Sequence, residues 1–409
     1  MQRRRHRSSR DEFARERYSA AAKPGHGRRI PVANRQLQAT HVFTNSFKRR
    51  AEALLARAEI QINGQQPWDI TVHREEFYSR VFREGTVGLG ESYMDGWWDA
   101  RALDQFFYRI FRVHLDKTPF PAWAAIGLYL RSLLFNTQRK SRSFKVGEDH
   151  YDRGNDMFEA MLDKRMVYTC GCWDSASNLD EAQQAKLEFV CRAIDLQPCM
   201  KVLDIGCGWG SFAKYAAEKY GARVVGITIS REQAKLAAER CAGLPVEIRV
   251  QDYRDLQGQF DCVVSLGMFE HVGYKNYRSY MNIVRHALSG CGRFYLGCIG
   301  KNCSVRATDP WIEKYIFPNS MIPSLKQVGA AAEGLFILEN FQNWAAHYDR
   351  TLMAWFHNFE THWNELRRRY DERFFRMWKF YLMASAGSFR SGSLQAWQML
   401  FSPEGAGGC

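Results

Sequence analysis

The sequence predicts an α/β protein whose larger part is a doubly wound, mostly parallel sheet, preceded by a smaller and mainly helical domain. Three observations support this. Short apolar runs rich in β-branched residues recur after residue 200, stretches with helical periodicity separate most of them, and a glycine-rich turn follows the first run. Strands that are buried on both faces and alternate with helices are typical of parallel sheets.

Composition sets limits on the class of protein. The chain has 409 residues, of which 46% are hydrophobic and 25% charged, so most of it should be globular. Residues 1–50 contain fourteen Lys or Arg and only three acidic residues, so they account for most of the net charge of +13 of the whole chain. We therefore interpret residues 1–42 as a basic, disordered tail that would be attracted to anionic lipid or nucleic acid. No apolar leader follows Met1, so we expect a cytoplasmic protein.

Residues 43–140 predict a mainly helical N-terminal domain. Apolar residues in 51–58 and 104–115 follow helical spacing, and the glycines of segment 85–96 predict a turn. The apolar segment 123–135 precedes a basic cluster, which suits a phospholipid surface. A packed core helix with a solvated end is an equally good interpretation. The basic cluster consists of Arg139, Lys140, Arg142 and Lys145.

Residues 141–409 predict the sheet domain. Stretches 211–220 and 231–241 predict helices between strands, and from about Trp344 onward the chain reads as helical and aromatic. None of the eleven cysteines forms a C-x-x-C pair, so we expect no metal site. The predicted strands are Val202–Ile205, Val224–Ile229, Val246–Val250, Cys262–Leu266 and Phe294–Cys298.

The strongest local signal is the turn after the first predicted strand, with Asp204 at the strand end and Gly206, Gly208 and Gly210 in the turn. Glycines let backbone N–H groups approach a ligand closely. The spacing G-x-G-x-G differs from the dinucleotide fingerprint, and no Lys-Ser/Thr follows, so this is not a P-loop. The motif resembles the first motif of class I S-adenosylmethionine-dependent methyltransferases. A purely structural turn remains the alternative.

Polar residues end the next two predicted strands. Thr228, Ser230 and Gln233 follow the second strand, where capping alone would explain Ser230. The same polar edge suits a ribose and an amino-acid carboxylate. Asp252 and Tyr253 follow the third strand, where an adenine ring could meet an aromatic ring and a carboxylate.

Longer segments resemble one family. Six segments are similar to motifs of bacterial cyclopropane fatty acid synthases and occur in the same order as in that family. They are Gly88–Trp98, His150–Asp156, Tyr168–Cys170, the glycine turn, Gly267–Gly273 and Asp349–Trp355. The resemblance covers about residues 50 to 402. It implies a class I methyltransferase Rossmann-like sheet with helical insertions. It also implies methylene transfer from S-adenosylmethionine to the cis double bond of unsaturated phospholipid acyl chains.

The resemblance further implies partners and a set of ligand-binding residues. We expect a homodimer, peripheral association with the inner face of the membrane, no nucleic acid, and bicarbonate as a bound general base. Residues 43–140 would serve lipid docking and dimerisation, and residues 141–409 catalysis. The expected cofactor-binding residues are Tyr168, Thr169, Asp204, Gly206, Cys207, Gly208, Gly210, Thr228, Ser230, Gln233, Asp252 and Tyr253.

Four residues match the family's bicarbonate site and are predicted to be catalytic: Cys170, Glu270, Ile299 and Tyr348. Each also has a structural explanation. Cys170 could be a small buried apolar residue, Glu270 could cap a helix or pair with the adjacent His, and Tyr348 could be a core aromatic residue.

The sequence departs from the family at two positions. Gly297 stands where the family has the His of the bicarbonate site, and Ser385 stands where a Cys is common. Since the alkene attacks the cofactor directly, no enzyme thiolate is needed and Ser385 should be tolerated. Gly297 leaves three possibilities: weaker bicarbonate binding, for which His347 could compensate; a C-methyltransferase that acts on acyl chains without ring closure; or an inactive lipid-binding relative. The Asn/Asp-Pro-Pro-Tyr/Phe and Pro-Cys motifs of nucleic-acid methyltransferases are missing.

Overall fold

The computed structural model describes residues 46–117 and 154–403. The predicted basic tail, the apolar segment 123–135, the basic cluster after it and the start of the motif 150–156 lie outside the described residues. Within the described ranges, none of the helices has the length and apolar character to cross a membrane.

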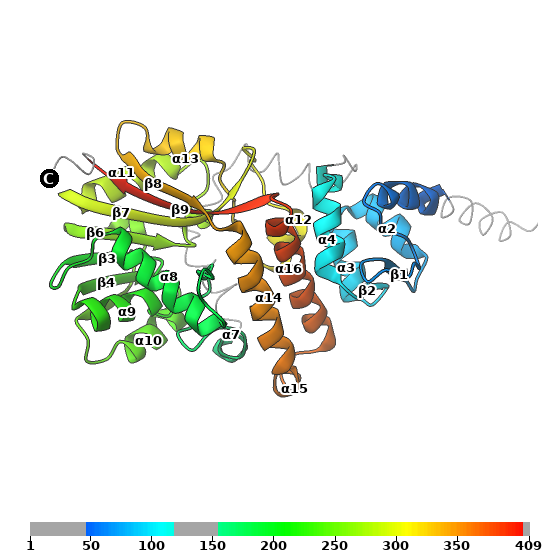
Figure 1. Ribbon diagram of the computed structural model, residues 1–409, viewed down its shortest axis with the longest axis horizontal. Helices are drawn as coiled ribbons and strands as arrows, with labels where there is room; N and C mark the ends of the chain where they lie inside the picture. Colours follow the sequence, from blue (N-terminus) through cyan, green and yellow to red (C-terminus); the bar gives the residue numbers. More distant parts are fainter. Residues whose placement is uncertain (1–45, 118–153, 404–409) are drawn as a thin grey trace, which may run out of the picture. The chain divides into compact units, whose positions relative to one another are not determined.

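A seven-stranded sheet forms the centre of the fold, in the order β5-β4-β3-β6-β7-β9-β8 (Figure 1). The first five of these strands run parallel, and β9 is antiparallel to both of its neighbours. All five predicted strands are confirmed. The bounds are β3 Lys201–Ile205, β4 Arg223–Thr228, β5 Val246–Val250, β6 Phe260–Leu266, β7 Leu288–Lys301, β8 Ile337–Asn343 and β9 Leu394–Ser402.

Successive residues of the central strands point to opposite faces of the sheet, and each face has its own helical cover. Val202 and Val264 belong to a core cluster with residues of α8 (Leu179–Ala193) and α9 (Ser211–Tyr220). Leu203 and Val263 belong to a second cluster with residues of α11 (Tyr277–Ala287) and α13 (Leu325–Ala332). Helix α10 (Arg231–Arg240) connects β4 to β5. This two-sided burial explains why the strands read as continuous apolar runs.

The remaining helices form an aromatic-rich layer around α16. Helix α16 packs against α14, α4 and α3, and Trp98, Trp355 and Trp378 are fully buried in the same core cluster. The bounds are helix 46–56, β1 Ile70–Val72, α2 Glu76–Glu84, α3 Thr86–Met94, β2 Trp98–Ala100, α4 Leu103–Arg112, η1 Leu115–Lys117, α7 Asn155–Met161, α12 Pro310–Tyr315, α14 Ala345–Thr361, α15 Trp363–Leu366 and α16 Glu372–Arg390.

Two sequence-based expectations about secondary structure are wrong. The glycine-rich segment 85–96 is mostly the helix α3 rather than a turn, because its glycines serve close packing. A Cβ on Gly90 would lie 2.2 Å from the indole nitrogen of Trp311, and a Cβ on Gly88 2.5 Å from the carbonyl oxygen of Arg80. The C-terminal region, which the sequence predicts to be helical, also contains strand β9, which pairs with β7 in the sheet.

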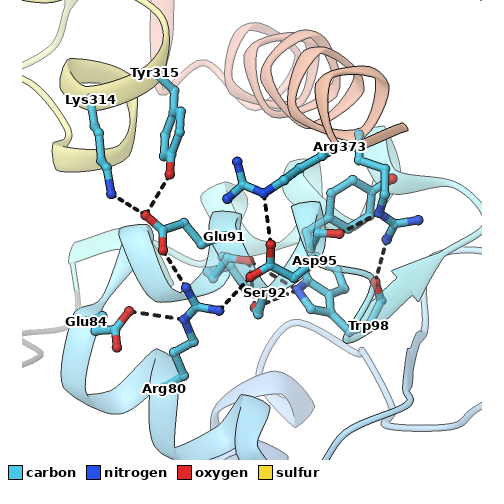
Figure 2. Close-up of polar contacts among 12 residues, drawn as sticks. Arg80, Glu84, Glu91, Ser92, Asp95, Trp98, Lys314, Tyr315 and Arg373 are labelled. Atoms are coloured by element: carbon cyan, nitrogen blue, oxygen red, sulfur yellow. Dashed lines mark hydrogen bonds and ion pairs between the residues drawn. The ribbon is translucent and has the colours of Figure 1, made fainter. Parts of the chain in front are cut away.

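An ionic cluster, which we call the Arg80 network, connects α2 and α3 to α12 and α16 (Figure 2). The guanidinium of Arg80 contacts three carboxylates, and two of these carboxylates contact residues of the later helices. The contacts are Arg80 Nε to Glu84 Oε2 at 3.2 Å, Arg80 Nη1 to Asp95 Oδ2 at 2.9 Å, Arg80 Nη2 to Glu91, Tyr315 hydroxyl to Glu91 Oε1 at 2.8 Å, Lys314 to Glu91, and Arg373 Nε to Asp95 Oδ1 at 3.0 Å.

Candidate active site

A glycine turn leads from the end of β3 at Ile205 into α9. Gly206, Gly208 and Gly210 have φ angles of 81°, 54° and 77°, where residues with a Cβ are strained. A Cβ on Gly206 would lie 2.8 Å from the Cβ of Met268, so the loop after β6 packs closely against this turn. The glycines therefore keep the backbone accessible at the carboxyl end of the sheet.

A cavity lies at this end of the sheet, where β4 and β6 flank β3 on opposite sides. Ligands of open α/β sheets bind at such topological switch points. Of the twelve predicted cofactor-binding residues, ten line the cavity: Tyr168, Thr169, Asp204, Gly206, Cys207, Gly208, Thr228, Gln233, Asp252 and Tyr253.

The other two predicted cofactor residues do not line the cavity. Gly210 allows α9 to approach α10, since a Cβ there would lie 3.1 Å from the Sγ of Cys241. Ser230 is the N-cap of α10, and its Oγ accepts a hydrogen bond from the backbone N–H of Gln233 at 3.2 Å. Their structural roles account for both residues.

Side chains at the ends of β4 and β5 are held in place by short-range hydrogen bonds. The hydroxyl of Thr228 donates to Gln233 Oε1 at 2.9 Å. Asp252 accepts from the backbone N–H of Arg254 at 3.0 Å, and the ring of Tyr253 meets Tyr280 edge-on at 5.2 Å. A fixed carboxylate beside an aromatic ring can bind the hydroxyl groups and the flat ring of a nucleoside.

The cavity also includes residues that sequence reasoning missed: Lys186, Gln251, Met268 and His271. Burial lowers the pKa of His271 to about 4, so its imidazole is neutral near pH 7. Lys186 had a signal in the sequence, because it occupies an apolar-face position of α8, between Ala182 and Val190 at helical spacing. Gln251 and Met268 lie in loops and His271 on a short 3-10 turn, so none of the three shows such periodicity.

Glu270 lies on the short 3-10 turn η3 (Phe269–His271) that follows β6, and it is 6% exposed. Its Oε1 accepts a hydrogen bond from the backbone N–H of Ile299 on β7 at 2.6 Å, so two predicted catalytic residues are in direct contact. Its Oε2 is buried and has no hydrogen-bond partner among the described residues. Burial raises the pKa of Glu270 to about 7. The carboxyl is therefore partly protonated at neutral pH.

Cys170 and Tyr348 share a hydrogen-bond acceptor at the start of α14. The thiol of Cys170 donates to the carbonyl oxygen of Trp344 at 3.7 Å, and the backbone N–H of Tyr348 donates to the same oxygen at 2.9 Å. Burial raises the pKa of Cys170, so the residue is a neutral thiol and not a thiolate nucleophile. The ring of Tyr348 stacks on Phe389 at 4.5 Å.

Little space is left for a larger residue at Gly297. A Cβ there would lie 3.0 Å from both Gln398 Oε1 and Leu266 Cδ2. His347, the suggested substitute donor, contacts other groups: its Nδ1 accepts from the backbone N–H of Trp173 at 3.0 Å, and its Nε2 lies 3.5 Å from Asp174 Oδ1.

The sheet order, the glycine turn at the switch point and the polar ends of β4 and β5 define a class I S-adenosylmethionine-dependent methyltransferase. A sequence model described as mycolic acid cyclopropane synthetase matches residues 138–399. The chain is 48% identical, over 90% of its own length and 96% of the relative's, to the cyclopropane-fatty-acyl-phospholipid synthase of Escherichia coli (strain K12). The protein belongs to the mycolic acid cyclopropane synthetase family.

More distant relatives agree with this assignment. The tuberculostearic acid methyltransferase of Mycobacterium tuberculosis is 32% identical over 82% of this chain and 83% of that protein. The solved cyclopropane synthase MmaA2 from Mycobacterium tuberculosis superposes with a TM-score of 0.60 at 27% identity, covering 63% of this chain and 97% of that one. The mycolic acid cyclopropane synthase CmaA1, solved with SAH and CTAB, gives the same values.

Proposed function

We propose that this protein transfers a methylene group from S-adenosylmethionine to the cis double bond of unsaturated phospholipid acyl chains, forming cyclopropane fatty acids. The observation that carries the proposal is Glu270. Its buried carboxyl has a free Oε2 among the described residues, and its neighbours Met268 and His271 line the cofactor cavity. A buried carboxyl group next to residues of this cavity supports the proposal, because the chemistry requires a group that can accept or hold a proton there.

Aromatic residues of α14, together with Tyr168, fit the electronic demands of this reaction. An alkene is a weak nucleophile, and after it attacks the sulfonium methyl the acyl group carries positive charge. Aromatic faces stabilise cations, and an apolar wall excludes water that would trap them. The ring of Trp355 lies 5.1 Å from Tyr168, which lines the cavity, and 6.0 Å from Tyr348. We propose that these rings line the site of the acyl group.

Ring closure requires removal of a proton from the added carbon. We propose that bound bicarbonate supplies the general base and that Glu270, Ile299, Cys170 and Tyr348 hold it. The donor set fits a small oxyanion: Glu270 carries a proton part of the time, Cys170 is a neutral thiol, and Tyr348 has a hydroxyl. The N–H of Ile299 is bonded to Glu270, so it would have to exchange partners to reach the anion.

Gly297 favours a second candidate function. Glycine supplies no side-chain donor at the position of the family's His, and loss of one hydrogen bond to a charged group costs about 1.5–3 kcal/mol. Weaker retention of the base would slow ring closure more than methyl transfer. The alternative function is therefore that of a C-methyltransferase, whose product carries a methyl branch on the acyl group.

We also propose that the protein works as a homodimer at the inner face of the membrane, with residues 43–140 docking lipid and forming the dimer. The support for membrane association is the basic character of residues 1–50 and of the cluster at 139–145, whereas the homodimer rests on the family resemblance alone. Flotation of the protein with anionic and with neutral vesicles tests the proposed membrane association. Equal recovery of protein with both vesicle types would contradict it, and a monomer in analytical ultracentrifugation would contradict the dimer.

Product analysis tests the main proposal. The protein is expressed in a bacterial host that lacks such an enzyme, and phospholipid acyl chains are analysed by mass spectrometry with fragmentation. We expect acyl groups longer by one carbon that contain a cyclopropane ring. A methyl branch would instead support the second candidate. Unchanged acyl groups, from folded protein that still binds S-adenosylhomocysteine, would contradict both.

A further inference from the structure

Thr351 is a fully buried polar residue on α14 that takes no part in the proposed reaction. Its hydroxyl donates to the carbonyl oxygen of His347, one helical turn earlier, at 2.7 Å. The same hydroxyl accepts from the backbone N–H of Gly171 at 3.1 Å and from the indole N–H of Trp173 at 2.9 Å. A hydroxyl has one hydrogen to donate and two lone pairs that accept, so every hydrogen-bonding position of Thr351 is used.

The bond within the helix determines where the hydroxyl can accept. Thr and Ser side chains in helices commonly donate to the carbonyl oxygen four residues earlier, and this bond selects one side-chain rotamer. In Thr351 the remaining lone pairs then face the loop 170–173, at sequence separations of 180 and 178 residues. Thr361, at the end of α14, makes the same internal bond to His357 at 2.8 Å but lies at an exposed position.

Three residues of α14 contact Trp173. Besides its indole bond to Thr351, the backbone N–H of Trp173 donates to His347 Nδ1 at 3.0 Å, and its carbonyl oxygen accepts from Arg350 Nη1 at 3.2 Å. Arg350 is exposed and His347 is partly exposed, so water can replace their bonds. Thr351 and Gly171 are buried, so water cannot replace the bond between them. The position of the loop 170–173 on α14 therefore depends most on Thr351.

A different helix, α8, holds the residue just before this loop. Lys186 Nζ donates to the hydroxyl of Thr169 at 2.7 Å, and Gln183 Nε2 donates to the carbonyl oxygen of Thr169 at 2.8 Å. Both donors lie on α8, and Thr169 lines the cofactor cavity. The part of this segment that faces the cofactor is therefore anchored separately from the loop 170–173.

The bonds of Thr351 lie next to two residues proposed to hold bicarbonate. Cys170 directly precedes Gly171, and Tyr348 lies one turn before Thr351 on α14. The carbonyl oxygen of Trp344 accepts from Cys170 Sγ at 3.7 Å and from the backbone N–H of Tyr348 at 2.9 Å. A displacement of the loop 170–173 from α14 would therefore move the thiol of Cys170 away from the helix that carries Tyr348.

We propose that Thr351 is a positioning residue of the bicarbonate site: its hydroxyl fixes the loop 170–173 against α14 and thereby sets the distance between the Cys170 thiol and the Tyr348 hydroxyl. This inference rests on the proposed function and adds to it a residue outside the lining of the cofactor cavity. Because α8 holds Thr169 separately, loss of the Thr351 hydroxyl should weaken the binding of bicarbonate and leave the binding of the cofactor unchanged.

The test measures bicarbonate binding without turnover. The melting temperature of the complex with S-adenosylhomocysteine is followed in increasing sodium bicarbonate at constant pH, with sodium chloride at equal ionic strength as the reference salt. A ligand that binds only the folded protein raises the melting temperature as its concentration rises. Thr351→Val keeps the shape of the side chain but removes the hydroxyl. We expect its apparent Kd for bicarbonate to rise about tenfold, as for loss of one hydrogen bond to a charged group.

Further measurements separate positioning from general damage. Thr351→Ser keeps the hydroxyl and should restore the wild-type Kd for bicarbonate. Affinity for S-adenosylhomocysteine, measured by isothermal titration calorimetry, should be the same in all variants. Thr361→Val is the matched control, since it removes the same internal bond of α14 at an exposed position and should bind both ligands as the wild type does. On unsaturated phospholipid vesicles, Thr351→Val should need more bicarbonate for turnover and yield more methyl-branched product.

Wild-type bicarbonate affinity in Thr351→Val, or equal losses of affinity for bicarbonate and for S-adenosylhomocysteine, would overturn the inference. A Thr351→Ser variant as weak as Thr351→Val would do the same. Should Thr351→Val not fold by near-ultraviolet circular dichroism, Trp173→Phe decides, because it removes the indole N–H without leaving a buried donor unpaired. Unchanged bicarbonate affinity in that variant would be equally contradictory.

The wild-type protein distinguishes failure of this inference from failure of the proposed function. Product formation with no response to bicarbonate, in melting temperature or in turnover, would refute the bicarbonate site and the role of Thr351 with it. Bicarbonate binding without lipid modification would refute only the proposed function, and the comparison of Thr351→Val with Thr351→Ser would still decide the role of Thr351.

Discussion

Two groups of acidic residues in this protein differ in how completely their carboxylates are paired. In the Arg80 network, Glu91 and Asp95 each contact two basic residues (Figure 2). In the cofactor cavity, Asp204 Oδ2 and, beside the cavity, Glu270 Oε2 have no hydrogen-bond partner among the described residues.

The difference is visible in the pKa directions. Burial alone would raise the pKa of Glu91, but hydrogen bonds from Lys314 and Tyr315 outweigh it, and the pKa is lowered. For Glu270, burial dominates and hydrogen bonds from backbone N–H groups, including that of Ile299, do not compensate, so the pKa rises. A fully paired cluster stabilises the contacts between helices, whereas a partly paired cluster is ready to bind a ligand or a proton.

The largest expected effect is on catalysis. Glu270→Gln keeps the acceptor for the N–H of Ile299 but removes the titrating carboxyl, so we expect product formation to fall about 10²- to 10⁴-fold. Turnover is measured with unsaturated phospholipid vesicles and S-adenosylmethionine. The matched control is Glu218→Gln at a half-exposed position on α9, which should retain activity. Wild-type turnover in Glu270→Gln would remove Glu270 from the proposed site.

The next effect is on stability. Arg80→Met leaves three carboxylates with fewer partners, and the Arg80 side chain is only 16% exposed. Breaking a buried pair costs about 3–5 kcal/mol, and partial exposure reduces this, so we expect a loss of about 2–3 kcal/mol in the free energy of unfolding by urea. Lys214→Met, in an exposed pair, should change it by less than about 1 kcal/mol. Equal effects would show that the Arg80 network is no stronger than a surface pair.

The pH dependence of stability should have opposite signs in the two clusters. The pKa of folded Glu270 is about 7, above its ordinary value of 4.5, so its contribution to stability is present below pH 4.5 and is lost as pH rises through 7. Glu270→Gln should therefore be more stable than the wild type by about 1–3 kcal/mol at pH 8, with no difference below about pH 4.5.

In the Arg80 network the pKa values of Glu91 and Asp95 are lowered, so its contribution is lost only as pH falls below their ordinary values of 4.5 and 3.8. Arg80→Met should accordingly flatten the acid side of the stability profile. Urea unfolding across pH 3 to 8 measures both variants. A Glu270→Gln variant that gains no stability at high pH would contradict the raised pKa.

The smallest effect concerns the glycines that bring the network helices together. Gly90→Ala would place a Cβ 2.2 Å from the Trp311 indole nitrogen, and we expect a loss of about 1–2 kcal/mol from the resulting strain. Gly329→Ala on α13 is the control, because nothing lies within 4 Å of its Cβ position. It should stabilise the protein by about 0.5–1 kcal/mol through helix propensity. Thermal melting that ranks the two variants in the reverse order would contradict this account of α3.

The parallel strands and the glycine turn could be predicted because their signals are local. Strands β3, β4 and β6 and the middle of β7 contain apolar runs, β5 alternates apolar with charged residues, and the turn after β3 requires positive φ that glycine adopts. Strand β8 gave no such signal, because it lies at the edge of the sheet, where Ile337, Leu338 and Phe341 are exposed and do not alternate with polar residues.

The sequence by itself determined the α/β class, the position of the cofactor turn and most residues around it, since backbone conformation and hydrophobic periodicity are properties of neighbouring residues. Only the tertiary structure decided that the glycines of α3 are packing sites and that the buried Lys186 donates to Thr169 in the cofactor cavity. The same holds for the contact between Glu270 and the N–H of Ile299. Burial, which moves the pKa of these groups, comes from segments distant in sequence that exclude water together, and no local pattern records it.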